Sequence, residues 1–157
     1  MSRSIDHGRW YRLGLSVPSN NVRFVSRYRL LPTPDQELGL LEHCSHARFV
    51  WNLACEQHAH WRPGRPAAPG YHEQARQLTE ARSEFAWLRA GSVTVRQQAL
   101  RDFAQAMRAF LVGVSRRPSW RKASRHKGFR LVAVKPEHME RLNRDRGRVW
   151  VPKVGST

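Results

Sequence analysis

A run of positive charge in the last third of the sequence has the clearest chemistry. Residues 116–135 hold eight Lys and Arg residues and no Asp or Glu, with Trp120 and Phe129 between them. Basic side chains bind phosphate, and aromatic rings placed among them can stack on nucleic-acid bases. The two aromatic residues could instead fill the hydrophobic core, which is where such side chains more often lie. The residues that we expect to follow a phosphate backbone are Arg116, Arg117, Arg121, Lys122, Arg125 and Lys127.

A second candidate surface lies on a helix predicted over residues 93–114. Glutamine and arginine make bidentate contacts with adenine and guanine edges in the major groove of DNA. An ordinary polar flank would have the same residues, so the spacing alone leaves both interpretations open. Four such side chains fall within about 80° of one another at 100° per residue, beside the apolar stripe of this helix: Gln97, Arg101, Gln105 and Arg108.

Histidine and cysteine residues cluster in one predicted helix, at His43, Cys44, His46, Cys55, His58 and His60. Cys55 and His58 are one helical turn apart and could share a metal ion, but no spacing in the cluster matches a zinc module. Surface histidines and small buried thiols explain the cluster more simply. We therefore expect no metal, no cofactor and no disulfide, since a helix holds Cys44 too far from Cys55 for a bridge.

The sequence has no pattern that is typical of catalysis. It contains no nucleophile–base motif, no phosphate-binding glycine loop and no pair of carboxylates at strand ends. Its twelve acidic residues are scattered mostly on predicted helix faces, so a two-metal nuclease centre is not expected. We expect a chain that binds and does not catalyse.

The composition favours nucleic acid as the partner. The formal net charge is +16, from 28 Lys and Arg residues against 12 Asp and Glu residues. Such a chain repels itself unless a polyanion neutralises it. No segment reaches the roughly 20 apolar residues of a membrane-spanning helix, and no signal peptide is recognisable. Membrane contact is therefore not expected. Two cysteines that are not expected to form a disulfide favour a reducing cytoplasm, and we expect a cytoplasmic, nucleoid-associated protein.

The first elements of the chain are a strand and a capped helix. A period of two predicts a strand over residues 22–31 and places three arginines on one sheet face, at Arg23, Arg27 and Arg29. Pro32 ends the strand because it has no N–H group for the ladder. Thr33 and Gln36 then form the capping box of a helix over about residues 34–61.

Two more helices and two strands are expected after this one. We expect the helices over residues 71–90 and 93–114, and the strands over 129–135 and 147–153. Gly91 is expected to end the second helix in the left-handed conformation. The last strand has no clear terminating element, so the sheet is expected to be incomplete.

Each predicted helix has an apolar face for the core. The first presents Leu40, Cys44, Ala47, Val50, Trp51, Ala54 and Trp61. The second presents Tyr71, Ala75, Leu78, Ala81, Phe85 and Leu88. The third presents Leu100, Phe103, Ala104, Met107, Leu111 and Val114.

Helices placed between strands of one small sheet form an α+β fold. The expected organisation has a weakly ordered extension at residues 1–21, sheet segments at 22–31 and 115–157, and a helical insert at 32–114.

Four blocks of the sequence resemble, in order, the TnpB (OrfB) proteins of bacterial insertion sequences. The run RYRLLPTPDQELGLLEHCSHARFVWN, from Arg27, resembles the strand–turn–helix and "RFVYN" segment near the start of those proteins. The other blocks are FAWLRAGSVTVRQQALRDFAQAMRAF (85–110), RPSWRK (117–122) and GRVWVPKVG (147–155). Together they cover about residues 22–155.

The resemblance implies an RNA-guided DNA endonuclease family in which this region is a wedge-type sheet or barrel with an inserted three-helix recognition lobe, also described as a helix-turn-helix domain. There, guide pairing reads the target while the protein reads a short flanking motif. Val93 stands where some members have a basic residue, so the motif preference cannot be transferred. The positions that approach the flanking motif correspond to Tyr71, Ser92, Thr94 and Gln97.

The family's nuclease carboxylates and zinc-binding cysteines belong to a C-terminal half that this sequence does not contain. We therefore expect a truncated, catalytically incomplete portion of a TnpB-like transposon protein, which binds DNA and a guide RNA without cleaving. Two alternatives stay open: a free-standing helix-turn-helix regulator that binds duplex DNA without RNA, and an inactive fragment of a decayed transposase. The oligomeric state is also open.

Overall fold

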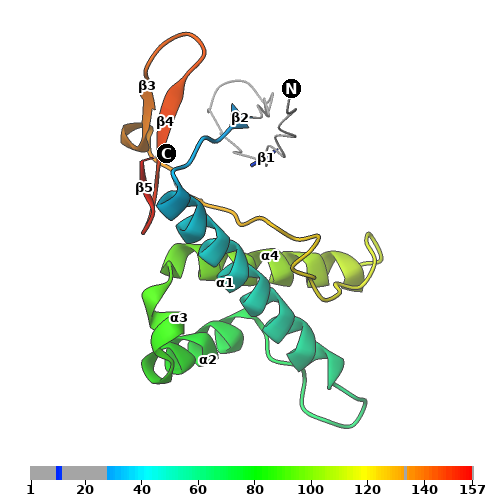
Figure 1. Cartoon of the computed structure of the whole chain (residues 1–157). Helices are drawn as coiled ribbons and strands as arrows, with labels where there is room; N and C mark the ends of the chain where they lie inside the picture. Colours follow the sequence, from blue (N-terminus) through cyan, green and yellow to red (C-terminus); the bar gives the residue numbers. More distant parts are fainter. Residues whose placement is uncertain (1–9, 12–27, 133, 157) are drawn as a thin grey trace, which may run out of the picture.

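The computed structural model describes residues 10–11, 28–132 and 134–156. Figure 1 shows that the α-helices gather in one part of the described structure and the antiparallel strands in another. This segregation is the expected α+β class. The elements are β1 (Trp10–Tyr11), β2 (Tyr28–Arg29), α1 (Pro34–Ala59), α2 (Tyr71–Glu84), α3 (Ala86–Ala90), α4 (Val93–Leu111), the 3-10 helix η1 (Pro136–His138), β3 (Met139–Arg141), β4 (Gly147–Val151) and β5 (Gly155–Ser156).

Helix α1 begins with the predicted capping box. The Thr33 hydroxyl accepts the Gln36 amide N–H at 3.4 Å, and Gln36 Oε1 accepts the Thr33 N–H at 2.9 Å. Pro34 occupies the first helical position, where no N–H is needed. The predicted start of α1 is therefore confirmed, and the helix ends at Ala59, two residues earlier than expected.

The single helix predicted over residues 71–90 is wrong, because the chain breaks at Phe85. Phe85 has φ −103° and ψ 111°, which is extended backbone, and it ends α2 and precedes α3. Its N–H donates to the Ala81 carbonyl at 2.9 Å and its carbonyl accepts from Arg89 at 3.1 Å. Both helix ends at the break are thus satisfied, and four α-helices lie between β2 and β3 in the described chain, instead of three.

Gly91 ends α3 for a different reason from the one predicted. Its φ of −74° is not left-handed. A Cβ atom at this position would collide with the imidazole ring of His46 in α1. Glycine therefore stands here because two elements approach closely.

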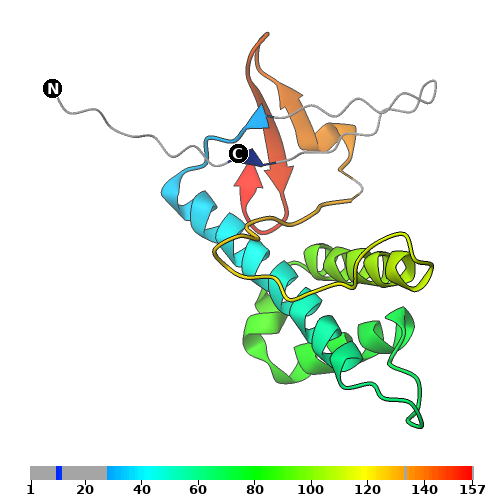
Figure 2. The ribbon, with the colours of Figure 1, turned by 90° about the vertical axis from the view of Figure 1, so that its right-hand side faces the viewer.

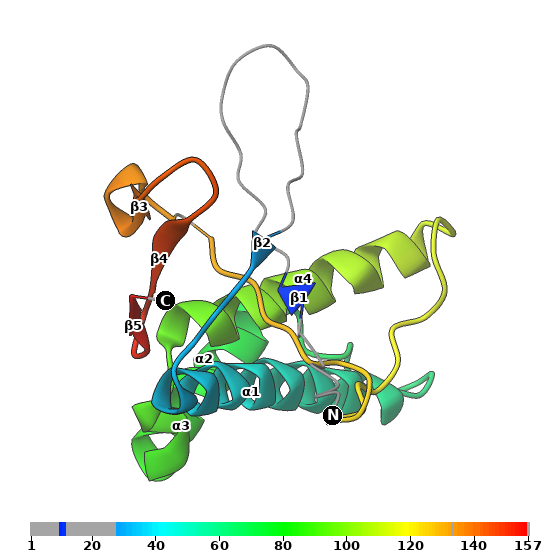
Figure 3. The ribbon, with the colours of Figure 1, turned by 45° about the horizontal axis from the view of Figure 1, so that its top comes forward.

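The hydrophobic core lies where α1 crosses α4, and Figure 3 shows the two helices side by side. The indole of Trp51 and the ring of Phe103 make an edge-to-face contact, with centroids 5.4 Å apart. The core thus draws on the predicted stripes of all the helical segments. Its buried members are Ala47, Val50, Trp51, Ala54, Cys55, Leu78, Val95, Ala99, Leu100, Phe103 and Met107.

Four residues predicted for the core are exposed instead: Trp61, Phe85, Leu111 and Val114. Each lies at or beyond a helix end that the periodicity placed too late. Helix α4 ends at Leu111, and Gly113 follows with φ 76°, a left-handed conformation that suits glycine. The amide N–H of Val114 then donates to the Ala109 carbonyl at 2.9 Å, which closes the helix end.

The strands form two separate antiparallel sheets, β1–β2 and β3–β4–β5. Met139 pairs with Val149, and Trp150 pairs with Ser156. In the described residues, no ladder joins the strand before the helices to the strands after them, so a single sheet interrupted by a helical insert is not observed. The rest of the expected extension at 1–21, and residues 22–27 of the expected first strand, lie outside the described residues.

The strand predicted over residues 129–135 is wrong for the described residues 129–132 and 134–135, which are irregular. The ladder forms later, at β3, after Pro136 opens η1. The second predicted strand is confirmed as β4, with Val149 and Val151 buried. Pro152 follows β4, and Lys153 and Gly155, both at positive φ, turn the chain into β5.

The turn between β4 and β5 rests on the first half of α1, as Figure 2 shows. His43 Nε2 lies 2.7 Å from the Pro152 carbonyl, and Gln36 Nε2 donates to the Ser156 carbonyl at 2.6 Å. Gln36 therefore caps α1 and also holds the last strand. Among the described residues, no helix has the length and apolar character needed to cross a membrane.

Candidate nucleic-acid interface

Helix α4 presents the predicted polar side chains along one exposed strip. The rest of the helix circumference holds buried residues such as Val95, Leu100 and Phe103. The strip is therefore accessible along the length of the helix. We call it the α4 strip, and its exposed members are Thr94, Gln97, Arg101, Gln105 and Arg108.

The two flanks of the α4 strip are held by neighbouring segments. Arg101 Nε donates to the Tyr71 hydroxyl at the start of α2 at 3.1 Å. The adjacent residue, Asp102, pairs through Oδ1 with Arg130 Nη1 at 2.8 Å and also accepts from Gln98 Nε2 at 2.8 Å. Successive helical residues point about 100° apart, so α2 and the segment around Arg130 lie on different sides of the strip.

Of the residues matched by position to flanking-motif contacts, Ser92 is not presented at the surface. It precedes α4, and only 4% of its surface is exposed. Tyr71 is half-buried against the core, with its hydroxyl engaged by Arg101. Thr94 and Gln97 are exposed.

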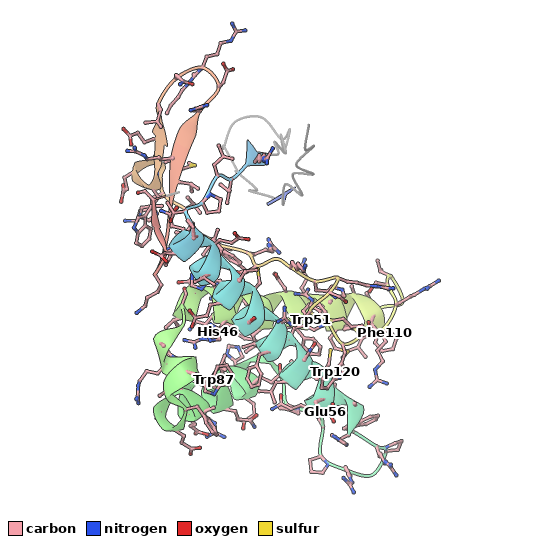
Figure 4. All side chains as sticks on the ribbon, viewed as in Figure 1. His46, Trp51, Glu56, Trp87, Phe110 and Trp120 are labelled. Atoms are coloured by element: carbon pink, nitrogen blue, oxygen red, sulfur yellow. The ribbon has the colours of Figure 1, made fainter. Side chains whose placement is uncertain are left out.

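The basic loop, residues 112–127, is fastened to α1 by side chains from the middle of that helix. Trp51 Nε1 donates to the Ser119 carbonyl at 2.9 Å. The Asn52 amide pairs with the backbone of Arg121, accepting its N–H at 2.8 Å and donating to its carbonyl at 3.1 Å. In Figure 4, Trp51 and Trp120 lie on the same side of α1. Trp51 and Asn52 thus position the loop that carries the charge.

Arg121 is expected from the sequence to contact phosphate, but its side chain packs against α1 instead. Its guanidinium carbon lies 3.5 Å from the centroid of the Trp51 ring, in a cation–π contact. Burial lowers the pKa of Arg121 below the usual arginine value, and the charge of Asp102 opposes that shift. In this fold Arg121 holds the loop against α1.

The other basic side chains of the loop are exposed. Arg117 Nη2 donates to the His58 carbonyl at 3.0 Å at the end of α1. The Lys122 carbonyl accepts the amides of Arg125, at 3.2 Å, and His126, at 2.9 Å, forming a turn. This turn presents positive charge to solvent. The exposed basic residues predicted for phosphate contact are Arg116, Arg117, Lys122, Arg125 and Lys127.

The two aromatic residues of the basic run have different environments. Trp120 is 57% exposed, so the core interpretation is wrong for it. Phe129 packs against the core and makes an edge-to-face contact with His43, with centroids 5.1 Å apart. Trp120 is therefore the aromatic residue of the run that can stack on a base.

The predicted arginine face of the first sheet is described only at Arg29. Arg29 lies in β2, where it pairs with Trp10, and it is exposed. Arg23 and Arg27 lie outside the described residues.

The histidine and cysteine cluster of α1 contributes to packing, as the contacts of His46 and the burial of Cys44 and Cys55 show. His46 stacks on Trp87, at 5.6 Å between ring centroids, on the other side of α1 from Trp51 (Figure 4). No disulfide joins Cys44 to Cys55, and burial raises the pKa of the Cys55 thiol. Within the described residues, no three His, Cys, Asp or Glu side chains are close enough to share a metal ion.

Sequence reasoning missed one pair of residues near the α4 strip. Arg82 and Arg96 line a hollow between α2 and α4. A signal existed, because Arg96 falls four residues before Leu100 and seven before Phe103, on the apolar stripe. An arginine on a core-facing stripe is unexpected and calls for a physical explanation.

Comparison with known proteins gives one family. Residues 22–63 match the model of the helix-turn-helix domain of the IS605 OrfB family. No curated protein matches the chain. In the described part of the matched segment lie β2 and the single long helix α1, while α2 begins only at Tyr71. A helix-turn-helix places a second helix three or four residues after the first, so the matched segment itself holds no reading helix of that kind among its described residues.

Proposed function

We propose that this chain is the nucleic-acid-binding N-terminal portion of a TnpB-like transposon protein, because residues 22–63 match the helix-turn-helix domain of the IS605 OrfB family. The helices within residues 32–114 form its binding lobe, and the strands within 22–31 and 115–157 support that lobe. DNA lies along the α4 strip, and the basic loop holds phosphates of DNA or of a guide RNA.

One observation carries this proposal: exposed arginines lie both on the α4 strip and on one flank of it. Arg101, on the strip, is held by Tyr71 from α2, and Arg130, on the opposite flank from α2, is held by Asp102. A duplex or a strand that lies along the strip would therefore meet several arginines, and phosphate contacts of this kind supply most of the affinity for nucleic acid.

Arg101 and Gln97 are the side chains proposed to contact bases. The hydrogen bond to Tyr71 uses Nε of Arg101, which leaves its two terminal nitrogens for a bidentate contact with guanine. Gln97 is exposed four residues earlier and offers the bidentate amide that suits adenine. The loss in conformational freedom on binding is reduced for Arg101, because Tyr71 already holds it.

The RNA part of the proposal rests on Trp120. This exposed ring is flanked by the basic side chains of the loop, an arrangement that suits an unpaired strand whose bases can stack. We further propose that the chain binds without cleaving, because the matched segment is a helix-turn-helix domain and the sequence has no motif typical of a nuclease.

The test is binding by the full chain, measured by fluorescence anisotropy over a salt series with duplex DNA, single-stranded DNA and RNA. The variant Gln97→Ala/Arg101→Ala should reduce affinity and relax sequence preference in a selection from random duplexes, since each bidentate contact is worth about 1–3 kcal/mol. Arg62→Ala/Arg65→Ala, in the exposed loop after α1, is the control because it also removes exposed arginine charge.

The outcomes separate the alternatives. Co-purified RNA whose digestion abolishes target binding would favour the guided-binding role. Tight duplex binding without RNA would favour a free-standing regulator. Binding that disappears near physiological salt and ignores Gln97→Ala would indicate an inactive fragment, and cleavage of plasmid DNA with Mg²⁺ would refute the non-cleaving part.

A further inference from the structure

The side chain of Arg96 is almost wholly enclosed, which is unusual for an arginine. Only 1% of its surface is exposed. Its Nη2 donates to the Gly91 carbonyl at 2.8 Å, but its Nε and Nη1 have no hydrogen-bond partner among the described residues. Buried guanidinium groups normally use their donors, because an uncompensated buried charge is costly. Core packing alone therefore does not explain Arg96.

A second arginine adds to this imbalance of charge. Arg82, in α2, is half-buried, and its Nε is also enclosed without a partner among the described residues. Burial and then the positive charge of Arg82 lower the pKa of Arg96 to about 10. No described salt bridge joins either arginine to a carboxylate.

The two arginines line one small hollow between α2 and α4. Its volume is about 20 Å³, and no acidic residue lines it. A space of this size admits oxygen atoms but not a sugar or a base. Gln97, a member of the α4 strip, also lines the hollow, so the hollow opens beside the surface proposed to contact DNA.

We propose that Arg82 and Arg96 form a phosphate-binding site, which takes the oxygens of one backbone phosphate of the nucleic acid that lies on the α4 strip. The planar fork of a guanidinium matches the geometry of phosphate, and the negative charge of a backbone phosphate relieves the repulsion between the two arginines. Because Arg96 is enclosed, the more exposed side chain of Arg82 turns to admit the phosphate.

This site deepens the proposed function and rests on it for the source of the phosphate. A phosphate held beside Gln97 fixes one strand at the place where Gln97 reaches a base. Phosphate contacts position a protein on nucleic acid, while base contacts supply the specificity. Arg82 and Arg96 are thus positioning residues for the contact made by Gln97.

The first experiment uses inorganic phosphate as the probe and needs no nucleic acid. The full chain is melted in phosphate and in chloride at equal ionic strength. Wild type should be stabilised saturably by phosphate, Arg82→Met and Arg96→Met should lose this response, and the control Arg65→Met should keep it. An equal response in all four proteins would overturn the site.

Melting in chloride distinguishes a binding role from a structural one. If Arg96 binds phosphate, Arg96→Met should melt no lower than wild type, because methionine replaces an uncompensated buried charge. A large loss of stability in chloride, together with an unchanged phosphate response in Arg82→Met, would make Arg96 structural and would overturn the proposal. Arg82 is only half-buried, so the Arg82→Met variant tests the phosphate response even if Arg96→Met does not fold.

The second experiment measures affinity for one oligonucleotide at fixed salt. Arg82→Met should bind about tenfold more weakly, the loss expected for a charge-assisted hydrogen bond, and Arg65→Met should change far less. Loss of the phosphate response with unchanged oligonucleotide affinity would mean that the site takes free phosphate, which overturns the nucleic-acid assignment. If wild type binds no nucleic acid, the proposed function fails, and the phosphate response alone supports or refutes the site.

Discussion

The guanidinium of Arg121 lies over the indole of Trp51, with its carbon 3.5 Å from the ring centroid. Trp51 belongs to the middle of α1, and Arg121 follows α4 in the basic loop, so this contact joins two segments that are distant in sequence. The Asn52 side chain pairs with the backbone of Arg121 next to it. Part of the positive charge in the loop therefore serves to hold the loop in place.

Arg121 and Lys122 are adjacent in sequence but should respond differently to substitution. Arg121→Ala removes a cation–π contact and the packing of the side-chain stem, so we expect the free energy of unfolding to fall by about 1–2 kcal/mol. Lys122 is exposed, and Lys122→Ala should change stability by less than about 0.5 kcal/mol. Urea denaturation of both variants checks this. Equal losses would contradict a structural role that is particular to Arg121.

Nucleic-acid binding should give the reverse order for this pair, once folding is controlled. Lys122→Ala should reduce the slope of log affinity against log salt by about 0.9 for duplex DNA, the value for one lost phosphate contact. Arg121→Lys keeps the charge and loses the flat stacking face, so it should leave the slope unchanged while lowering stability.

The Asn52 side chain should be worth more than its partial exposure suggests. Asn52→Ala leaves both an N–H and a carbonyl of Arg121 without their partner, and we expect a loss of about 1–3 kcal/mol. Asn52→Asp keeps the acceptor for the Arg121 N–H and loses the donor, so its loss should be smaller. Hydrogen exchange at the Arg121 amide reports the local effect. An amide that exchanges at the same rate in wild type and in Asn52→Ala would contradict this anchor.

Trp120 should contribute to binding single strands and little to stability, because it is exposed. Trp120→Ala should weaken binding to single-stranded RNA or DNA by about 1–3 kcal/mol, the usual value of one stacked base. Trp120→Phe keeps a stacking face and should retain most of the affinity. Anisotropy titrations measure the affinities, and thermal melting serves as the control for folding. An Ala variant with wild-type affinity would exclude Trp120 from the interface.

The start of α1 could be predicted from the sequence because its determinants are local. Thr33, Pro34 and Gln36 act within one turn, and the structure has their capping box. The break at Phe85 could not be predicted, since apolar spacing continues across it and the sequence there contains no proline or glycine. The strand expected at 129–135 does not form for a related reason. Its pattern suits a β-ladder, but the partner strand β4 pairs with the later segment β3 instead.

The exposure of some site residues could be predicted from the sequence, and that of others could not. Gln97 and Arg101 were placed on an exposed strip by periodicity alone, because a helix fixes relative directions over four residues. Arg121 and Lys122 look equivalent in sequence, and only the position of Trp51 separates them. The pair Arg82 and Arg96 depends on how α2 packs against α4, which no local pattern encodes.

Stability should fall as the solution becomes mildly acidic. Burial lowers the pKa of both His46 and His58 below the ordinary value of 6.5, and the charge of Arg96 adds to the effect on His46. As the pH falls, the unfolded chain therefore takes up protons on these histidines before the folded chain does. Their contribution to the free energy of unfolding is complete above pH 6.5 and is lost as the pH drops toward the lower folded pKa values. Urea unfolding over this range tests it. His46→Gln/His58→Gln should show a flatter dependence, and an unchanged profile would rule these two groups out as its source.

The close approach of Gly91 to His46 gives a prediction about a single methyl group. A Cβ at residue 91 would meet the His46 ring, while the φ of −74° is acceptable for alanine, so any cost of Gly91→Ala comes from crowding alone. We expect that cost to be about 1–3 kcal/mol, as for other overpacked sites. In a His46→Ala background the added methyl group has room, and the same substitution should cost much less. A double-mutant cycle by urea denaturation measures this coupling. Additive losses would show that the backbone at Gly91 yields and that His46 does not fix its position.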